Sequence, residues 1–434
     1  MQTKAKEKIN IVTLGCAKNL VDSEVIMTQL KGNKKDVFHQ REDINPDVVI
    51  INTCGFIDKA KQESIDTILK HAKEKDEGII KKLFVTGCLS ERYKDDLKSD
   101  IPEVDGFYGT RDLPELLKNF EAKYRNELLG ERIITTDSHY AYLKISEGCD
   151  RPCSFCAIPL MRGRHISKPM EQIVLEAKNL VSNGVREIML IAQDSTYYGI
   201  DIYKKRMFSE LLNKLSEVEG LDWIRIHYAY PSGFPMDIIE VMKEKKNICN
   251  YLDIPLQHGS TRMLKIMKRG ITREKTDDLI RRIRDINPEI ALRTTLIAGH
   301  PGETEEDFHE MYEFVERSQF DRLGIFTYSH EEGTSSHKLE DDVPENIKRS
   351  RSNKIMALQQ KISEEKNSKK VGKTFKVLID RADANNYYGR TEHDSPEVDN
   401  EVIIPTKEMH LRVGDFYDIL ITDSREYDII GKVV

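Results

Sequence analysis

Residues 142–159 read YLKISEGCDRPCSFCAIP, an apolar run typical of a strand followed at once by a loop with three cysteines. Cys149, Cys153 and Cys156 have the spacing Cys-x3-Cys-x2-Cys. Three thiolates on one short loop can hold three irons of a cubane 4Fe-4S cluster and leave the fourth iron without a protein ligand. The stretch therefore predicts a strand that leads into an iron-sulfur site with one open iron.

A structural zinc site is the alternative interpretation of this loop. His165 could complete a closed Cys3His tetrahedron, an arrangement that is common among structural zinc sites. Zinc knuckles favour paired Cys-x2-Cys units, and the loop does not have that pattern. The spacing favours the cluster.

The chain around this loop, from about residue 140 to residue 370, alternates strand-like runs with helix-like stretches. Six strand candidates predict a partial (β/α)6 barrel similar to a TIM barrel, with its working residues at the carboxyl ends of the strands. Gln193, His258 and Arg293 are the candidates for binding a cofactor there, although each could equally be a hydrogen-bonded structural group. The polar residues expected at these strand ends are Gln193, Asp194, Arg225, His227, Gln257, His258, Arg293 and Thr295.

The N-terminal part, to about residue 125, alternates runs such as INIVTL, DVVIINT and KLFVTG with helices near 20–31 and 57–75. This alternation predicts a parallel α/β sheet. Cys16, Cys54 and Cys88 each stand just past the end of such a strand, where open α/β sheets place their ligands. A single buried cysteine would be interpreted as a small hydrophobe. Three in the same context predict a second 4Fe-4S cluster, whereas Cys249 fits neither set and is expected in the core.

The C-terminal part begins after a predicted surface helix over 344–370 and has short strand-like runs that predict a small antiparallel β barrel. From residue 372 on it holds 4 Lys and 4 Arg against 8 Asp and 5 Glu. A surface for a phosphate backbone would be cationic, so this acidic part is predicted to dock a basic protein, with Glu397 and Asp399 among the contacts. The alternative is a solvated, solubilising face.

The composition of the whole chain narrows the class of protein. A chain of 434 residues is longer than one hydrophobic core usually supports. We therefore predict three domains, at 7–125, 135–370 and 371–434. A net charge of -7 gives no overall footprint for nucleic acid, and no apolar run approaches the roughly 18 residues of a membrane span. Seven cysteines without a signal-peptide pattern indicate the reducing cytoplasm and favour metal ligation over disulfides.

Together with TLGCAKNLVDSE at 13–24, the two cysteine sets and the terminal barrel resemble the radical S-adenosylmethionine (SAM) methylthiotransferase family over nearly the whole chain. The resemblance implies an N-terminal methylthiotransferase domain, a radical SAM core and a C-terminal TRAM domain. It implies that SAM chelates the open iron held by Cys149, Cys153 and Cys156 and is cleaved to a 5'-deoxyadenosyl radical. The other cluster would then hold the methylthio sulfur.

The amino-acid sequences of two motifs resemble those of one branch of that family. Gly-Cys-Ala-Lys-Asn at 15–19 and IAQDSTYYG at 191–199 look like the branch that modifies the β-carbon of an aspartate in a small-subunit ribosomal protein, and HYAYP at 227–231 adds weaker support. The branch that modifies a tRNA adenosine is the alternative, and it usually reads Gly-Cys-Gln-Met-Asn at the first position. A non-catalytic RNA-binding protein with zinc or an iron-sulfur cluster is the alternative from another class.

The resemblance also implies partners. They are a basic ribosomal protein, free or within the small ribosomal subunit, an electron donor such as flavodoxin or ferredoxin, and a sulfur donor. Two features depart from the family pattern: His300 stands where an aromatic residue is usual, and Arg151-Pro152 stiffens the cysteine loop. Neither departure removes a ligand.

Overall fold

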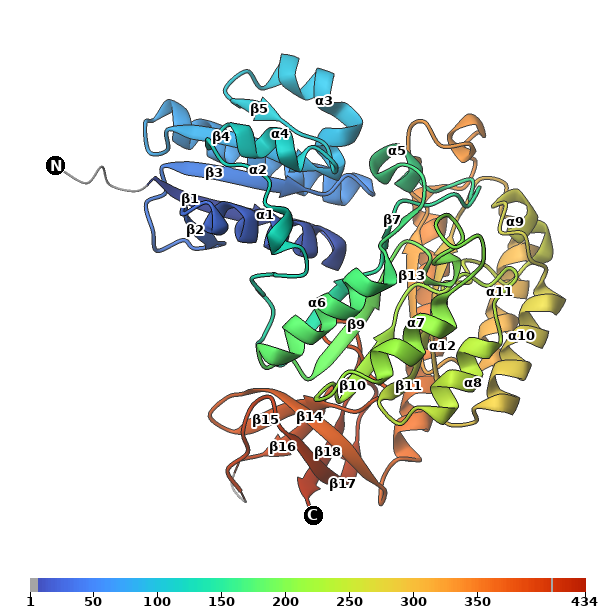
Figure 1. Cartoon of the computed structure of the whole chain (residues 1–434). Coiled ribbons are helices and arrows are strands. Elements are labelled where there is room, and N and C mark those ends of the chain that lie inside the picture. Colours follow the sequence, from blue (N-terminus) through green and yellow to red (C-terminus); the bar gives the residue numbers. More distant parts are fainter. Residues whose placement is uncertain (1–6, 407–408) are drawn as a thin grey trace.

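The computed structural model describes residues 7–406 and 409–434. Their strands form a five-stranded sheet, a six-stranded sheet, a closed five-stranded barrel and a two-stranded sheet, β7-β8. In Figure 1 the five-stranded sheet lies above the six-stranded one and the closed barrel lies below it. The predicted α/β class, with an N-terminal parallel domain, a partial barrel and a terminal β barrel, is confirmed.

The N-terminal sheet has the strand order β2-β1-β3-β4-β5, and every neighbouring pair is parallel. Helix α1 packs on one face together with α4, and α2 and α3 pack on the other. The central strand β3 is buried throughout because both faces are covered. The elements are β1 (Lys8–Thr13), α1 (Ala17–Gly32), β2 (Asp36–His39), β3 (Val48–Thr53), α2 (Asp58–Asp76), β4 (Lys82–Gly87), α3 (Cys88–Asp100), β5 (Gly106–Phe107), α4 (Leu113–Lys118) and the 3-10 turn η1 (Asn126–Leu128).

The six-stranded sheet has the order β13-β12-β11-β10-β9-β6, so its parallel strands lie side by side in the order of the chain. Strands β6 and β13 are its two edges, as expected for a partial barrel. The elements are β6 (Tyr140–Lys144), β7 (Ser146–Glu147), α5 (Ile158–Arg162), β8 (Ile166–Ser167), α6 (Met170–Ser182), β9 (Glu187–Ile191), η2 (Ser195–Tyr197), α7 (Phe208–Ser216), β10 (Trp223–Ile226), α8 (Asp237–Glu244), β11 (Ile248–Asp253), α9 (Thr261–Ile266), α10 (Arg273–Ile286), β12 (Ala291–Ala298), α11 (Glu305–Ser318), β13 (Arg322–Thr327) and η3 (Ser336–Lys338).

Helix α12 (Glu345–Ser368) forms where the sequence predicts it and contacts β12 and β13. Of its apolar residues, Ile355, Leu358 and Ile362 are buried in the barrel core, whereas Ile347 remains exposed. The helix therefore covers the last strands of the partial barrel and leads into the C-terminal barrel.

The C-terminal barrel closes in the order β14-β15-β16-β18-β17 around an aliphatic core. Its neighbouring pairs are antiparallel, as predicted for the barrel, except β16 and β18, which run parallel. Strand β15 reads NYYGR, which lacks the aliphatic run that reveals the other strands. The strands are β14 (Thr374–Ala382), β15 (Asn386–Arg390), β16 (Val402–Pro405), β17 (Phe416–Ser424) and β18 (Ile429–Val433).

A loop of the C-terminal barrel, residues 391–400, packs into the partial barrel, and we call it the plug loop. The Tyr251 hydroxyl donates to Asp399 at 2.7 Å, Arg293 pairs with the same carboxylate at 3.5 Å, and Arg322 pairs with Asp394. The Asp399 side chain is only 1% exposed, and the Tyr140 hydroxyl donates to Glu397 at 3.2 Å. The prediction that Asp399 contacts a docked protein is wrong, because its buried carboxylate binds Tyr251 and Arg293 within the chain.

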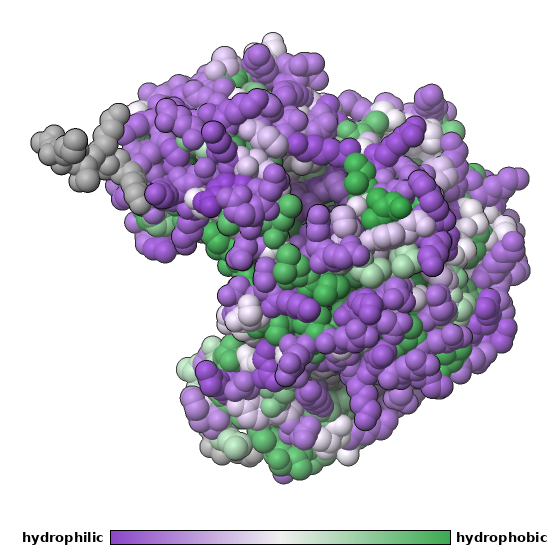
Figure 2. Space-filling view, in the orientation of Figure 1, coloured by the Kyte–Doolittle hydropathy of each residue, from purple (hydrophilic) through white to green (hydrophobic). Residues whose placement is uncertain are grey.

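Figure 2 shows the surface on one side of the molecule. A hollow opens between the N-terminal domain and the C-terminal barrel, and hydrophobic residues lie at its floor. None of the helices among residues 7–406 and 409–434 combines the length and apolar character that a membrane crossing requires.

Candidate functional site

Cys16, Cys54 and Cys88, called the N-terminal set below, follow the adjacent strands β1, β3 and β4 at one sheet edge. The glycines before Cys16 and Cys88 allow these segments of backbone to lie close to the residues at the end of β3. Gly15 has φ +90° and a Cβ there would lie 2.6 Å from the Cys54 Cβ. Gly87 has φ +98° and a Cβ there would lie 2.4 Å from Asn52 Oδ1. Since L side chains rarely adopt such φ values, the two Gly-Cys steps position the cysteines.

Asn19 on α1 holds this edge together. Its Nδ2 donates to the carbonyl oxygens of Leu14 at 2.8 Å and Thr53 at 2.9 Å, which lie just before two of the cysteines. Its Oδ1 lies 3.6 Å from Cys88 Sγ. Burial raises the pKa of the Cys54 thiol and raises that of Cys88 to about 12. Binding of a metal cluster would therefore displace protons from these thiols.

In the set Cys149, Cys153 and Cys156, called the cysteine loop, two of the three sulfurs have a hydrogen-bond donor beside them. Arg269 Nη1 lies 3.1 Å from Cys153 Sγ, and the Arg151 amide donates to Cys149 Sγ at 3.4 Å. Burial raises the pKa of Cys149 to about 11 and of Cys156 to about 12. Donors to sulfur stabilise the thiolate form that binds metal, so the Arg151 amide opposes part of the effect of burial on Cys149.

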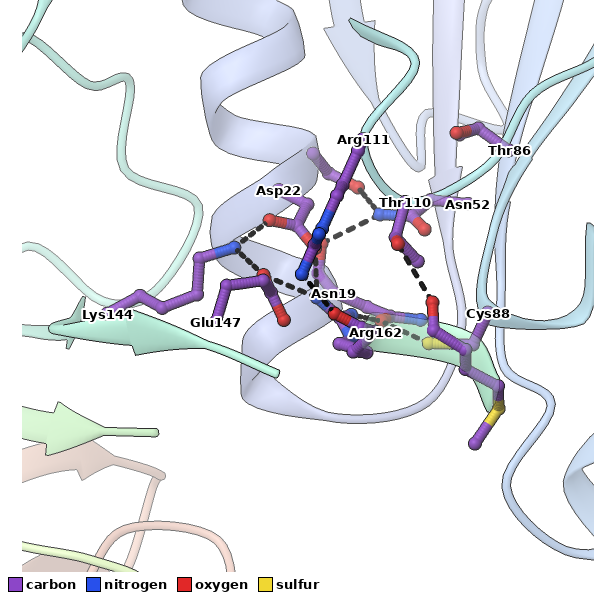
Figure 3. A network of polar contacts seen from close by, with 12 residues as sticks. Asn19, Asp22, Asn52, Thr86, Cys88, Thr110, Arg111, Lys144, Glu147 and Arg162 are labelled. Atoms are coloured by element: carbon purple, nitrogen blue, oxygen red, sulfur yellow. Dashed lines mark hydrogen bonds and ion pairs between the residues drawn. The ribbon is translucent and has the colours of Figure 1, made fainter. Parts of the chain in front are cut away.

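The two cysteine sets lie next to each other across the domain boundary. Cys88 packs with Ala157, Ile158 and Met161, which directly follow Cys156. Beside this apolar contact lies a network of Asn19, Asp22, Lys144, Glu147 and Arg162, shown in Figure 3 and called the bridging network. The N-terminal domain and the partial barrel thus meet at their cysteines.

The chemistry of each set fits a 4Fe-4S cluster with one open iron. Each supplies three sulfurs, and the seventh cysteine, Cys249, is 1% exposed in a cluster with Trp223 and Tyr251. His165, the ligand of the zinc alternative, has its Nε2 3.0 Å from Ser167 Oγ and 3.7 Å from Asp201. Among residues 7–406 and 409–434, no three His, Cys, Asp or Glu side chains are arranged to hold a single metal ion. Ligation by the six cysteines stays a prediction.

Two of the predicted cofactor-binding residues have partners within the protein. His258 is fully buried, with Nε2 3.1 Å from Glu303 and Nδ1 accepting from the Ser260 amide. Arg293 donates to Asp253 at 3.0 Å besides its contact with Asp399 of the plug loop. Gln193 instead lies beside the cysteine loop, where its Nε2 donates to Glu147 at 3.1 Å.

Three of the other polar residues predicted at the strand ends fall into two groups. Asp194 accepts from Arg151 of the cysteine loop at 2.7 Å. Arg225 donates to the carbonyl of Glu392, and His227 lies 3.0 Å from Ser395 Oγ, so both contact the plug loop. For Arg225 and His227 the expectation of a place at the open mouth is wrong, because the plug loop occupies the space beside them.

The two departures from the family pattern have structural explanations. The Arg151 guanidinium lies over the rings of Tyr197 and Tyr230, at 4.7 and 4.2 Å from their centroids. The His300 ring packs on Tyr328 with centroids 4.9 Å apart, so it fills the place of an aromatic residue.

The bridging network was missed as a set by the sequence analysis. Asn19 and Asp22 stand in the TLGCAKNLVDSE motif, and that motif was the available signal for them. Lys144, Glu147 and Arg162 flank the cysteine loop in the sequence, but no spacing pairs them with residues more than a hundred positions away.

Family models match three parts of the chain. The radical SAM superfamily model matches residues 143–315, the model of uncharacterized protein family UPF0004 matches residues 8–109, and the TRAM domain model matches residues 371–434. The three models fall on the partial barrel, the N-terminal sheet and the closed barrel.

Curated relatives match along the whole chain. Proteins named ribosomal protein uS12 methylthiotransferase RimO from Cytophaga hutchinsonii and Christiangramia forsetii are 59% and 57% identical, covering 99% and 100% of this chain and 98% and 96% of their own. One from Bacteroides thetaiotaomicron is 52% identical and covers 99% of both chains.

Solved structures show the fold at low identity. The radical SAM methyltransferase TsrM from Kitasatospora setae, with tryptophan substrate and a SAM analogue bound, is 14% identical with a TM-score of 0.55, covering 74% of this chain and 73% of its own. The cobalamin-dependent SAM radical enzyme OxsB matches with a TM-score of 0.51 at 14% identity, covering 77% of this chain and 55% of its own.

Proposed function

Because the chain belongs to the RimO family of ribosomal protein uS12 methylthiotransferases, we propose that it adds a methylthio group to the β-carbon of an aspartate in uS12. The chain is a radical SAM methylthiotransferase. The observation that carries the proposal is the identity of 52% to 59% with RimO relatives over the whole length. The adjacency of two three-cysteine sets supports it, since the chemistry needs both a radical and a sulfur source.

We assign one 4Fe-4S cluster to each cysteine set. An unactivated C-H bond is not acidic enough for ordinary acid-base groups, so the cofactors supply the radical and the methylthio sulfur when bound. The protein holds and orients them. Cys149, Cys153 and Cys156 would hold the cluster that binds SAM, with Arg269 donating to one sulfur. The N-terminal set would hold the other cluster.

Gln193 is the residue we propose to contact SAM. It lies beside the cysteine loop, and its Oε1 is buried without a hydrogen-bond partner among the described residues. A buried acceptor without a partner is costly, so a ligand that donates to it would be stabilised. His258 and Arg293 would have to exchange existing partners to bind SAM, and we propose that they act by positioning the strand ends.

The substrate is proposed to be uS12 and not a tRNA adenosine, because the relatives carry that name. A ribosomal protein is typically basic, and the chain carries a net charge of -7, which favours association with it. We propose an electron donor of the flavodoxin or ferredoxin type, a separate sulfur donor and a cytoplasmic location. The proposed domains are 7–125, 135–370 and 371–434.

The proposal can be tested with the anaerobically reconstituted full chain. The chain, SAM, a reductant and sulfide would be incubated with uS12 and, separately, with unmodified tRNA, and both products would be examined by mass spectrometry. We expect a methylthio group on one aspartate of uS12 and none on tRNA. Modified tRNA with unmodified uS12 would favour the other branch of the family.

A further inference from the structure

Arg162, at the end of α5, is the central residue of the bridging network. Its side chain is 1% exposed, and Nη1 donates to Asp22 at 2.8 Å and to Glu147 at 3.0 Å. Nη2 donates to Asn19 Oδ1, the atom that also lies 3.6 Å from Cys88 Sγ. Figure 3 shows the guanidinium between the carboxylates and Cys88. One buried cation from the partial barrel thus reaches the cysteines of the N-terminal domain.

The same residue is joined to the cysteine loop through the backbone. The carbonyl of Gly163, the next residue, accepts from the Cys149 amide at 3.1 Å. Glu147, which accepts from Arg162, precedes Cys149 by two positions. Arg162 therefore connects the two cysteine sets, with its side chain directed to one and its adjoining backbone bonded to the other.

The charges in the network show what the guanidinium contributes. Asp22 and Glu147 are opposed by Lys144 and Arg162, so the four side chains carry no net charge together. Loss of the guanidinium would leave two carboxylates against one ammonium beside Cys88. The surroundings of Cys88 would then carry more negative charge and would lack the guanidinium as a hydrogen-bond donor. Both changes lower the reduction potential of an iron-sulfur cluster.

We propose that Arg162 is a positioning residue that raises the reduction potential of the cluster at the N-terminal set, by holding a positive charge and Asn19 against Cys88. The inference rests on the proposed function, because it requires a cluster at Cys16, Cys54 and Cys88. Lys144 alone cannot replace it, since its ammonium contacts Asp22 and Glu147 from the other side of the network.

The test uses reconstituted full-length protein and three variants. Arg162→Met removes the charge, and Arg162→Lys keeps a charge but cannot hold two partners with a rigid fork. Arg132→Met is the matched control, because Arg132 is also 1% exposed and pairs with Glu24 of α1 and Glu176 of α6 across the same two domains. Both cluster potentials would be measured by redox titration followed by electron paramagnetic resonance, after iron analysis.

We expect Arg162→Met to shift the potential of the N-terminal cluster to a more negative value, Arg162→Lys to shift it less, and both to shift the potential at the cysteine loop by a smaller amount. Arg132→Met should move neither potential. If Arg162→Met does not fold, the shift in Arg162→Lys decides. Unchanged potentials in the Arg162 variants, or an equal shift in Arg132→Met, would overturn the inference. A single cluster in the unaltered protein would instead contradict the proposed function.

Discussion

The N-terminal set and the cysteine loop each offer three thiols, but the chain assembles them in different ways. Cys149, Cys153 and Cys156 stand on one loop, so their spacing is fixed by eight consecutive residues. Cys16, Cys54 and Cys88 come from the ends of three strands and meet only when the parallel sheet has formed. Their placement therefore depends on glycines, on Asn19 and on Arg162 from another domain. A site built from distant parts of the chain should be more sensitive to its surroundings.

The largest expected effect separates the two sets by function. Cys153→Ala removes a ligand of the proposed SAM cluster and should abolish formation of 5'-deoxyadenosine. Cys54→Ala should keep that reaction and lose methylthiolation of uS12. Both products would be measured by liquid chromatography and mass spectrometry. Equal loss of SAM cleavage in both variants, with normal iron in the untouched cluster, would refute the division of roles.

Gly15→Ala should sharpen the comparison by damaging only the N-terminal set. The new Cβ would lie 2.6 Å from the Cys54 Cβ, at a φ of +90° that alanine disfavours. We expect loss of about four irons, one cluster's worth, and normal 5'-deoxyadenosine formation. Gly78→Ala is the control, because Gly78 has φ +74° with open space around it. Iron loss in the control as well would show that general destabilisation is the cause.

The sequence could predict those features that depend on local pattern. The cysteine loop follows from its spacing, and the strand-end cysteines follow because parallel strands end at one sheet edge. The pairing of Arg162 with Asp22 could not be predicted, since 140 positions separate the two residues. The prediction that Asp399 lies on a docking surface is wrong for a related reason. An acidic residue in a polar loop is usually solvated, and only the folded barrel shows Tyr251 and Arg293 beside it.

Asp399→Ala should show that the plug loop stabilises the fold of the partial barrel but does not affect iron binding at either cysteine set. Its loss leaves Asp253 as the remaining carboxylate that pairs with Arg293 among the described residues, and we expect the free energy of unfolding to fall by about 3 kcal/mol. Asp418→Ala, at an exposed position of the same β barrel, should change stability by less than about 0.5 kcal/mol. Denaturant unfolding would measure both, and iron analysis should give the same content in each. A drop in iron would connect the plug loop to the clusters.

His300, which lies beside the cysteine loop, should make the stability of the protein depend on pH. Its Nε2 lies 3.4 Å from Ser154 Oγ, and burial lowers its pKa from 6.5 to about 4. The unfolded chain therefore binds this proton more readily, so the stability contribution is present above pH 6.5 and is lost as the pH falls toward 4. His300→Phe should remove that loss, which amounts to about 2 kcal/mol in denaturant unfolding between pH 8 and pH 5. Parallel pH curves for both proteins would contradict the assignment.

The smallest effect is expected at Cys249, which tests whether burial alone distinguishes a cysteine. Its side chain is 1% exposed among Trp223, Tyr251, Ala291 and Leu378, and burial raises the pKa of its thiol. Cys54 is also buried, but it shares a sheet edge with two other cysteines, whereas Cys249 packs with apolar groups. Cys249→Ala removes one sulfur atom from the core and should cost about 1 kcal/mol. Iron content and methylthiolation should remain unchanged, and loss of about four irons would show that a third arrangement of ligands had been overlooked.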